Sequence, residues 1–256
     1  MALARQAVPP FVHLAAHPVR WRLLAELSNG DYRVRELVVR VGEPQNLVSY
    51  HLRLLRDSGL VTASRSSNDR RDSYYHLDLD RAAEMLTGAC AALHPALQMA
   101  STPTELESSV PSMVLFVCAG NSARSAIAEA LLRQRAGGRV EGLSAGTRPK
   151  PFMHANTVRV LWEEFGIDLS DQRPRHLDTL IDQPFDAVVT LCDKAREICP
   201  DFGDDPRWIH WSIPDPVASG SEDSYPAFLA TAAEIDTRIR YLLPTLTALD
   251  PTKRSA

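Results

Sequence analysis

The sequence VLFVCAGNSARSAIAEALLRQ, residues 114–134, joins an apolar run to a helical pattern through a loop of small residues. The run that ends at Cys118 is continuously apolar, as expected for a strand buried on both faces. From Ser125 onward, apolar residues recur at helical spacing until a glycine ends the pattern. Cys118 is therefore either a nucleophile in an anion-binding loop or a buried core thiol.

The loop from Cys118 to Ser125 has the chemistry of an oxyanion site. An arginine lies six positions after the cysteine, and its guanidinium can bind two oxygens of a tetrahedral anion. The positive surroundings favour the reactive thiolate, which the Ser125 hydroxyl can hydrogen-bond. Backbone N–H groups of a strand–helix loop point at the same anion. We expect oxyanion binding by Ala119, Gly120, Asn121, Ser122, Ala123, Arg124 and Ser125, with Asn121 also bracing the loop.

Apolar and amphipathic stretches alternate after this loop, which predicts a parallel sheet with helices on both faces. Strands are expected in VEGLSAG, FDAVVTLCD and RWIHWSI, and helices in ANTVRVLWEEFG, AREICP and from about Pro226 to Leu243. Ligands of such sheets bind beyond the carboxyl ends of the strands, where Cys118 falls. A thiolate that displaces an oxygen from such an anion also needs an acid nearby to protonate that oxygen.

Composition divides the chain into two domains. Residues 99–112, MASTPTELESSVPS, have linker composition, which leaves domains at 1–98 and 113–256. Residues 1–76 hold 11 Arg against 7 Asp and Glu, and the other 180 residues hold 17 Lys and Arg against 25 Asp and Glu. A basic first part is typical of a nucleic-acid-binding module.

Composition also indicates the cellular compartment in which the protein works. The four cysteines are too few and too widely spaced for a disulfide scaffold. No apolar run approaches the roughly 18 residues that span a membrane, and the N-terminal stretch lacks a secretory layout. We therefore expect a cytoplasmic protein with no membrane contact.

The first domain has the element order of a mainly α winged helix-turn-helix. Helices are expected in PVRWRLLAELSNG, RVRELVVRVG and PQNLVSYHLRLLRDSGLV, followed by a hairpin around SNDRR. The third helix would enter the major groove, and hairpin arginines would contact phosphates. The expected DNA-binding residues are Gln45, Asn46, Ser49, Tyr50 and Arg53 on the helix and Arg65, Arg70 and Arg71 on the hairpin.

This domain resembles the ArsR family of bacterial repressors through LAAHPVRWRLLAEL, SYHLRLLRDSGLV and YYHLD. The resemblance implies a homodimer that binds an operator. Many members of that family sense arsenite or metals through a cysteine pair in the second helix. The corresponding stretch has Arg33 and Arg35 and no thiol, so sensing at that position is not expected.

The second domain resembles the low-molecular-weight tyrosine phosphatase fold in its arsenate reductase branch. The resemblance rests on VCAGNSARS, SAGTRP, GIDLSDQRP, FDAVVTLCDKAREICP and HWSIPDP. It implies a flavodoxin-like α/β sheet with Cys118 as nucleophile, Arg124 as oxyanion binder and Asp215 as general acid. Some relatives bind potassium beside the loop, but Arg175 stands where they have an aspartate, so we expect no bound metal.

Cys192 and Cys199 distinguish the two activities that this resemblance allows. A phosphatase needs one cysteine, whereas a thioredoxin-coupled arsenate reductase needs three. The two cysteines lie seven apart and would share a face of a helix, yet they could bond only after local unwinding. We expect a disulfide relay from Cys118 through Cys192 to Cys199, with no bound cofactor and with thioredoxin or another thiol system as reductant.

Two alternatives stay open from the sequence. One is a phosphatase, although the stretch after Asp215 has no aromatic residue to stack on an aryl phosphate. The other is a regulator whose second domain only senses an oxyanion or redox state.

Overall fold

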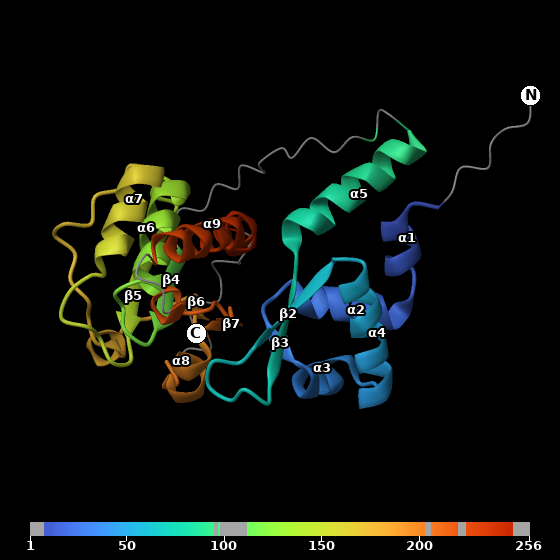
Figure 1. The fold of residues 1–256 in the computed structure, drawn as a ribbon, viewed down its shortest axis with the longest axis horizontal. Helices are drawn as coiled ribbons and strands as arrows, with labels where there is room; N and C mark the ends of the chain where they lie inside the picture. Colours follow the sequence, from blue (N-terminus) through green and yellow to red (C-terminus); the bar gives the residue numbers. More distant parts are fainter. Residues whose placement is uncertain (1–7, 95–96, 98–111, 203–205, 220–223, 248–256) are drawn as a thin grey trace, which may run out of the picture. The chain divides into compact units, whose positions relative to one another are not determined.

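The computed structural model describes residues 8–94, 97, 112–202, 206–219 and 224–247. The chain divides into two compact units, Met1–Thr102 and Pro103–Ala256, and each has its own apolar core (Figure 1). The expected linker at 99–112 lies outside the described residues except for Ser112, which begins a strand.

The first unit is a small helical domain with one hairpin. Its elements are α1 (Pro10–Ala15), α2 (Pro18–Leu27), β1 (Tyr32–Arg33), α3 (Val34–Val41), α4 (Gln45–Asp57), β2 (Val61–Arg65), β3 (Ser73–Leu77) and α5 (Leu79–Leu93). The buried side chains of α4 recur at helical spacing and are Val48, His51, Leu52 and Leu55, while Leu47 is half-buried. Gly42 ends α3 with φ 69°, a left-handed conformation that a residue without Cβ adopts freely.

The hairpin is the one that alternation predicts, with one strand added. β2 and β3 pair antiparallel from Val61 opposite Leu77 to Arg65 opposite Ser73. β1 pairs with the other side of β3, giving the order β1-β3-β2. Sequence reasoning missed β1 because two residues carry no periodicity.

The second unit is built on a four-stranded parallel sheet of order β5-β4-β6-β7. Its elements are β4 (Ser112–Cys118), α6 (Arg124–Ala136), β5 (Val140–Gly146), α7 (Ala155–Phe165), η2 (Leu177–Leu180), β6 (Ala187–Thr190), α8 (Asp193–Ile198), β7 (Arg207–His210), η3 (Pro216–Ser219) and α9 (Tyr225–Thr247). In Figure 1, α6, α7 and α9 lie together on one side of the strands and α8 lies on the other.

Strand order decides where a ligand can bind. The chain leaves β4 toward β5 and returns to β6 on the other side, so the connections diverge beyond the end of β4. Cys118 lies opposite Gly146, and the Leu191 N–H donates to the Val117 carbonyl at 2.7 Å. The segment after β6 therefore runs beside Cys118. Within the described chain, no helix is both long and apolar enough to cross a membrane.

Candidate active site

The loop that follows β4 encloses the sulfur of Cys118. Cys118 is 2% exposed, and its Sγ lies 3.0 Å from the Ser125 hydroxyl and 3.3 Å from the Asn121 backbone nitrogen, which donates to it. In the part of the chain that the structure describes, the N–H groups of Gly120, Ser122 and Ala123 donate to no other group. These donors are available to an anion at the mouth of the loop.

Asn121 holds the loop open from its centre. Its φ of 48° is left-handed, a conformation that asparagine tolerates better than most residues. Its side chain is buried, accepts from the Arg175 backbone N–H at 2.8 Å, and donates to the Ser125 and Ser144 hydroxyls at 2.9 and 2.8 Å. The three bonds fix a conformation that would otherwise be unfavourable.

The strand end at Gly146 packs directly against the loop. A Cβ at Gly146 would lie 2.8 Å from the Ala119 carbonyl oxygen, so only glycine fits. Beyond it, the chain runs along the loop. The N–H groups of Thr147, Arg148 and Lys150 donate to the carbonyls of residues 118, 119 and 120 at 3.1, 2.8 and 2.9 Å, respectively. Because the loop carbonyls are turned outward to these donors, its N–H groups face inward.

Arg124 and Asp215 meet beside this loop. The Arg124 guanidinium is buried, donates through Nη1 to the Ile213 carbonyl at 3.0 Å, and lies with Nη2 3.1 Å from the Asp215 carboxylate. Its Nε is buried and has no hydrogen-bond partner in the described part of the chain. A buried charged donor without an acceptor is costly, and an oxyanion would satisfy it. Sequence reasoning missed Ile213, because a backbone acceptor leaves no sequence signal.

Cys192 and Cys199 stand at the two ends of α8. Cys192 is its N-cap and accepts from the Ala195 N–H at 3.4 Å, while Cys199 is its C-cap. Burial raises the pKa of the Cys192 thiol, the Arg124 guanidinium lowers it, and a Cys118 thiolate raises it. Burial also raises the pKa of Cys199, to about 12. Because α8 has only six residues and the two cysteines flank it, the cysteines do not lie within one helix that could present both on one face.

The residues expected to bind DNA are all exposed. Gln45, Asn46, Ser49, Tyr50 and Arg53 lie on the open face of α4, and Arg65, Arg70 and Arg71 lie at or beyond the end of β2. The Arg71 guanidinium pairs with Asp69 at 2.8 Å, and Arg53 stacks over the Tyr50 ring. At the turn end of the hairpin, just before β3, Asp72 pairs with Arg33 at 3.3 Å and with Arg35 at 3.0 Å.

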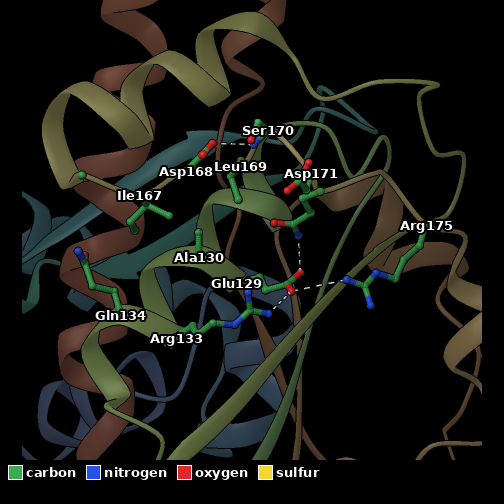
Figure 2. Close-up of a pocket in the computed structure, with 12 residues that line it drawn as sticks. Glu129, Ala130, Arg133, Gln134, Ile167, Asp168, Leu169, Ser170, Asp171 and Arg175 are labelled. Carbon is green, nitrogen blue, oxygen red and sulfur yellow. Dashed lines mark hydrogen bonds and ion pairs between the residues drawn. The ribbon is translucent and has the colours of Figure 1, made fainter.

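A pocket of about 560 Å³ is lined by side chains of α6 and of residues 166–175, and neither Cys118 nor Arg124 is among them (Figure 2). At its end, Arg133 and Arg175 approach the buried Glu129 carboxylate at 2.6 and 3.6 Å. That carboxylate also accepts from Ser144 at 2.5 Å and Gln172 at 3.0 Å. These residues do not fit potassium, because guanidinium groups already neutralise the carboxylate. Among the described residues, no cluster of three or more His, Cys, Asp or Glu side chains could hold a metal ion.

Comparison with known proteins identifies the second unit. Residues 113–253, more than half of the chain, match the family model described as low molecular weight phosphotyrosine protein phosphatase. The chain belongs to this phosphatase family. Residues 17–63 match the model described as bacterial regulatory protein, arsR family. The predicted fold classes, and the fusion of an ArsR-type domain to a phosphatase-fold domain, are confirmed.

Several proteins similar to the second unit are arsenate reductases by name. That of Halalkalibacterium halodurans is 34% identical over 130 residues, which are 50% of this chain and 92% of the relative. The Brevibacillus brevis protein is 36% identical over 127 residues, 50% of this chain and 90% of the relative. The Bacillus subtilis protein is 35% identical over 130 residues, 50% of this chain and 92% of the relative.

Proposed function

We propose that the second domain reduces arsenate to arsenite with three cysteines and that the first domain binds operator DNA as a homodimer. The observation that carries the enzyme proposal is the position of Cys192. It is buried, and both Cys118 and the Arg124 guanidinium lie close enough to influence the pKa of its thiol. Hydrolysis of a phosphate ester requires one thiol only, so a second thiol beside the nucleophile favours the reductase.

In the first step, Cys118 attacks arsenate held by the loop N–H groups and by Arg124. A sulfur–arsenic bond forms and an arsenic–oxygen bond breaks, and Asp215 gives a proton to the leaving oxygen, which departs as water. Arg124 touches both the anion site and Asp215. One guanidinium can therefore hold the substrate and orient the acid.

In the second step, the Cys192 thiolate attacks the sulfur of Cys118. A disulfide forms, and the sulfur–arsenic pair of electrons stays with arsenic, which leaves as arsenite. In the third step, Cys199 attacks Cys192 and releases the Cys118 thiolate. The resulting Cys192–Cys199 disulfide takes two electrons from thioredoxin or another dithiol, which becomes oxidised.

The test of this relay is arsenate-dependent NADPH consumption coupled through thioredoxin and thioredoxin reductase. The wild type should turn over continuously, Cys192→Ser should give no arsenite, and Cys199→Ser should stall after about one turnover. Cys90→Ser is the matched control, because Cys90 is a free cysteine of the first unit. Sustained turnover by Cys199→Ser would contradict the relay.

Phosphate ester hydrolysis is the second candidate, favoured by the Cys118, Arg124 and Asp215 arrangement alone. It needs neither Cys192 nor Cys199. Hydrolysis of an aryl phosphate that survives Cys192→Ser, in a wild type that makes no arsenite, would replace the reductase proposal.

The DNA-binding proposal rests on the ArsR match and on the exposed polar face of α4. Binding to duplex DNA should weaken as salt rises, and Arg70→Ala should reduce the slope of log K against log salt by about 1. Arg71→Ala should change the slope less, because Asp69 already pairs with Arg71 and this pairing holds the pKa of Asp69 at about 2. Equal slopes for wild type and Arg70→Ala would remove Arg70 from the interface.

Operator occupancy should respond to neither arsenate nor arsenite through α3. Arg33 and Arg35 pair with Asp72 and supply no thiol there. DNA binding measured with and without each oxyanion separates a sensing second domain from a purely catalytic one.

A further inference from the structure

A buried polar cluster lies beside Cys192 and has no part in the steps above. We call Thr190, Asp193, His210 and Ser212 the Asp193 cluster. Asp193 Oδ1 accepts from the Ser212 hydroxyl at 2.8 Å and lies 3.2 Å from His210 Nε2. His210 Nδ1 lies 2.9 Å from the Thr190 hydroxyl. All four residues are at least nine-tenths buried.

One arrangement of protons gives each of these contacts a donor and an acceptor. If His210 carries its proton on Nε2, it donates to Asp193, and Nδ1 accepts from the Thr190 hydroxyl. The Asp193 carboxylate then accepts hydrogen bonds from His210 and Ser212 in a water-poor site. Removing one partner of such a group leaves a buried charge poorly compensated.

The cluster includes residues on both sides of Cys192 in the chain and so holds the backbone before and after it. Thr190 ends β6 two residues before it, and Asp193 begins α8 one residue after it. His210 and Ser212 come from the end of β7 and the segment that follows, which also supplies the Ile213 carbonyl to Arg124. Cys192 is thus tied to the same segment that orients the oxyanion-binding arginine.

The two ends of α8 differ in the exposure of their side chains. Asp193 and Ala195, near its start, are buried, whereas Glu197 and Ile198, near its end, are exposed. Cys192 and Cys199 are about 10 Å apart along a helix that rises about 1.5 Å per residue. A disulfide requires Cα atoms about 4.4–6.8 Å apart. Part of α8 must therefore unwind for the third thiol step.

We propose that the Asp193 cluster anchors the Cys192 end of α8 beside Cys118, so that only the Cys199 end unwinds and moves. Asp193 and His210 are then positioning residues for the attack of Cys192 on Cys118. This inference rests on the proposed relay. Unwinding of the other end of α8 then brings Cys199 to Cys192, while Cys192 stays beside Cys118.

The experiment measures the second thiol step by itself. In a Cys199→Ser background, the chain is mixed with arsenate, quenched with acid, and assayed by mass spectrometry for the Cys118–Cys192 disulfide. His210→Leu should form this disulfide at least tenfold more slowly. His210→Gln should stay within about threefold of the parent, because its amide can still donate to Asp193. Gln134→Ala is the control, since it loses one hydrogen bond, to the Phe165 carbonyl, outside the cluster.

Each outcome decides one claim. If the parent forms no Cys118–Cys192 disulfide, the relay itself is wrong. If the parent forms it and a folded His210→Leu forms it equally fast, the relay stands and the anchor is wrong. If His210→Leu does not fold, Ser212→Ala carries the test, since it removes the hydroxyl that donates to Asp193 and keeps the charged group.

Amide hydrogen exchange adds a readout that a general loss of stability would not reproduce. Oxidising Cys192 and Cys199 in the wild type should speed exchange in residues 196–199 and leave residues 191–194 protected. In Ser212→Ala, oxidation should also expose residues 191–194. Loss of protection at both ends of α8 in the oxidised wild type would overturn the anchor.

Discussion

At the scale of single residues, the three nitrogens of the Arg124 guanidinium have three different roles. Nη1 and Nη2 are held by Ile213 and Asp215, and Nε is left for the anion. Arg124→Lys keeps the charge but loses the planar fork. We expect kcat/KM for arsenate to fall about 100- to 1000-fold, as when a transition-state donor is removed. Steady-state kinetics and inhibition by phosphate measure it, and Arg135→Lys on the same helix is the control.

The surroundings of His51 lead to a prediction about how the stability of the first unit depends on pH. Its ring is buried, lies with its centroid 4.2 Å from that of His17 at an interplanar angle of 41°, and has no hydrogen-bond partner in the described part of the chain. Burial lowers the pKa of His51, and the charges of His17 and Arg20 lower it further, against a smaller opposite effect of Glu43. The folded first unit therefore keeps this ring neutral where the unfolded chain takes up a proton.

Because the unfolded state binds more protons, His51 contributes a loss of stability as pH falls through the ordinary histidine pKa of about 6.5. Denaturant midpoints of the first unit, compared between about pH 7.5 and about pH 5.5, should shift less in His51→Gln than in wild type. His13→Gln, at an exposed position, should retain the wild-type shift. An unchanged pH response in His51→Gln would contradict the prediction.

At the scale of elements, α8 couples the reactivity of Cys199 to helix stability. While the helix is folded, burial holds the pKa of Cys199 at about 12, so its thiol is almost entirely protonated near neutral pH. Lys194→Gly, at an exposed helical position, should cost about 1 kcal/mol of helix stability. Alkylation of Cys199, followed by peptide mapping, should then run about fivefold faster. Arg240→Gly in α9 should not change it.

Most elements could be predicted from the sequence because their apolar residues recur with the period of a helix or strand. The loop of Cys118 could be predicted because its chemistry depends on neighbours in the chain. The Asp193 cluster could not, because Asp193 meets His210 and Ser212 only after β6 and β7 pair. His210 in RWIHWSI looks like an ordinary strand residue.

At the scale of the whole molecule, each unit has a separate apolar core, so each should unfold in its own transition. Phosphate at about 100 times its dissociation constant should stabilise the second unit by about 2.7 kcal/mol and leave the first unchanged. Differential scanning calorimetry with and without phosphate measures both transitions. Arg124→Lys should abolish most of the shift, and movement of both transitions would show coupled unfolding.

The arrangement of Arg175 behind the anion loop has a consequence for the conditions in which the protein works. A counter-ion that is part of the polypeptide has a fixed local concentration, whereas a dissolved one follows its surroundings. Arg175 contacts both the Glu129 carboxylate, through its guanidinium, and the Asn121 side chain, through its backbone N–H. We therefore expect the bracing of the loop not to require a particular alkali cation.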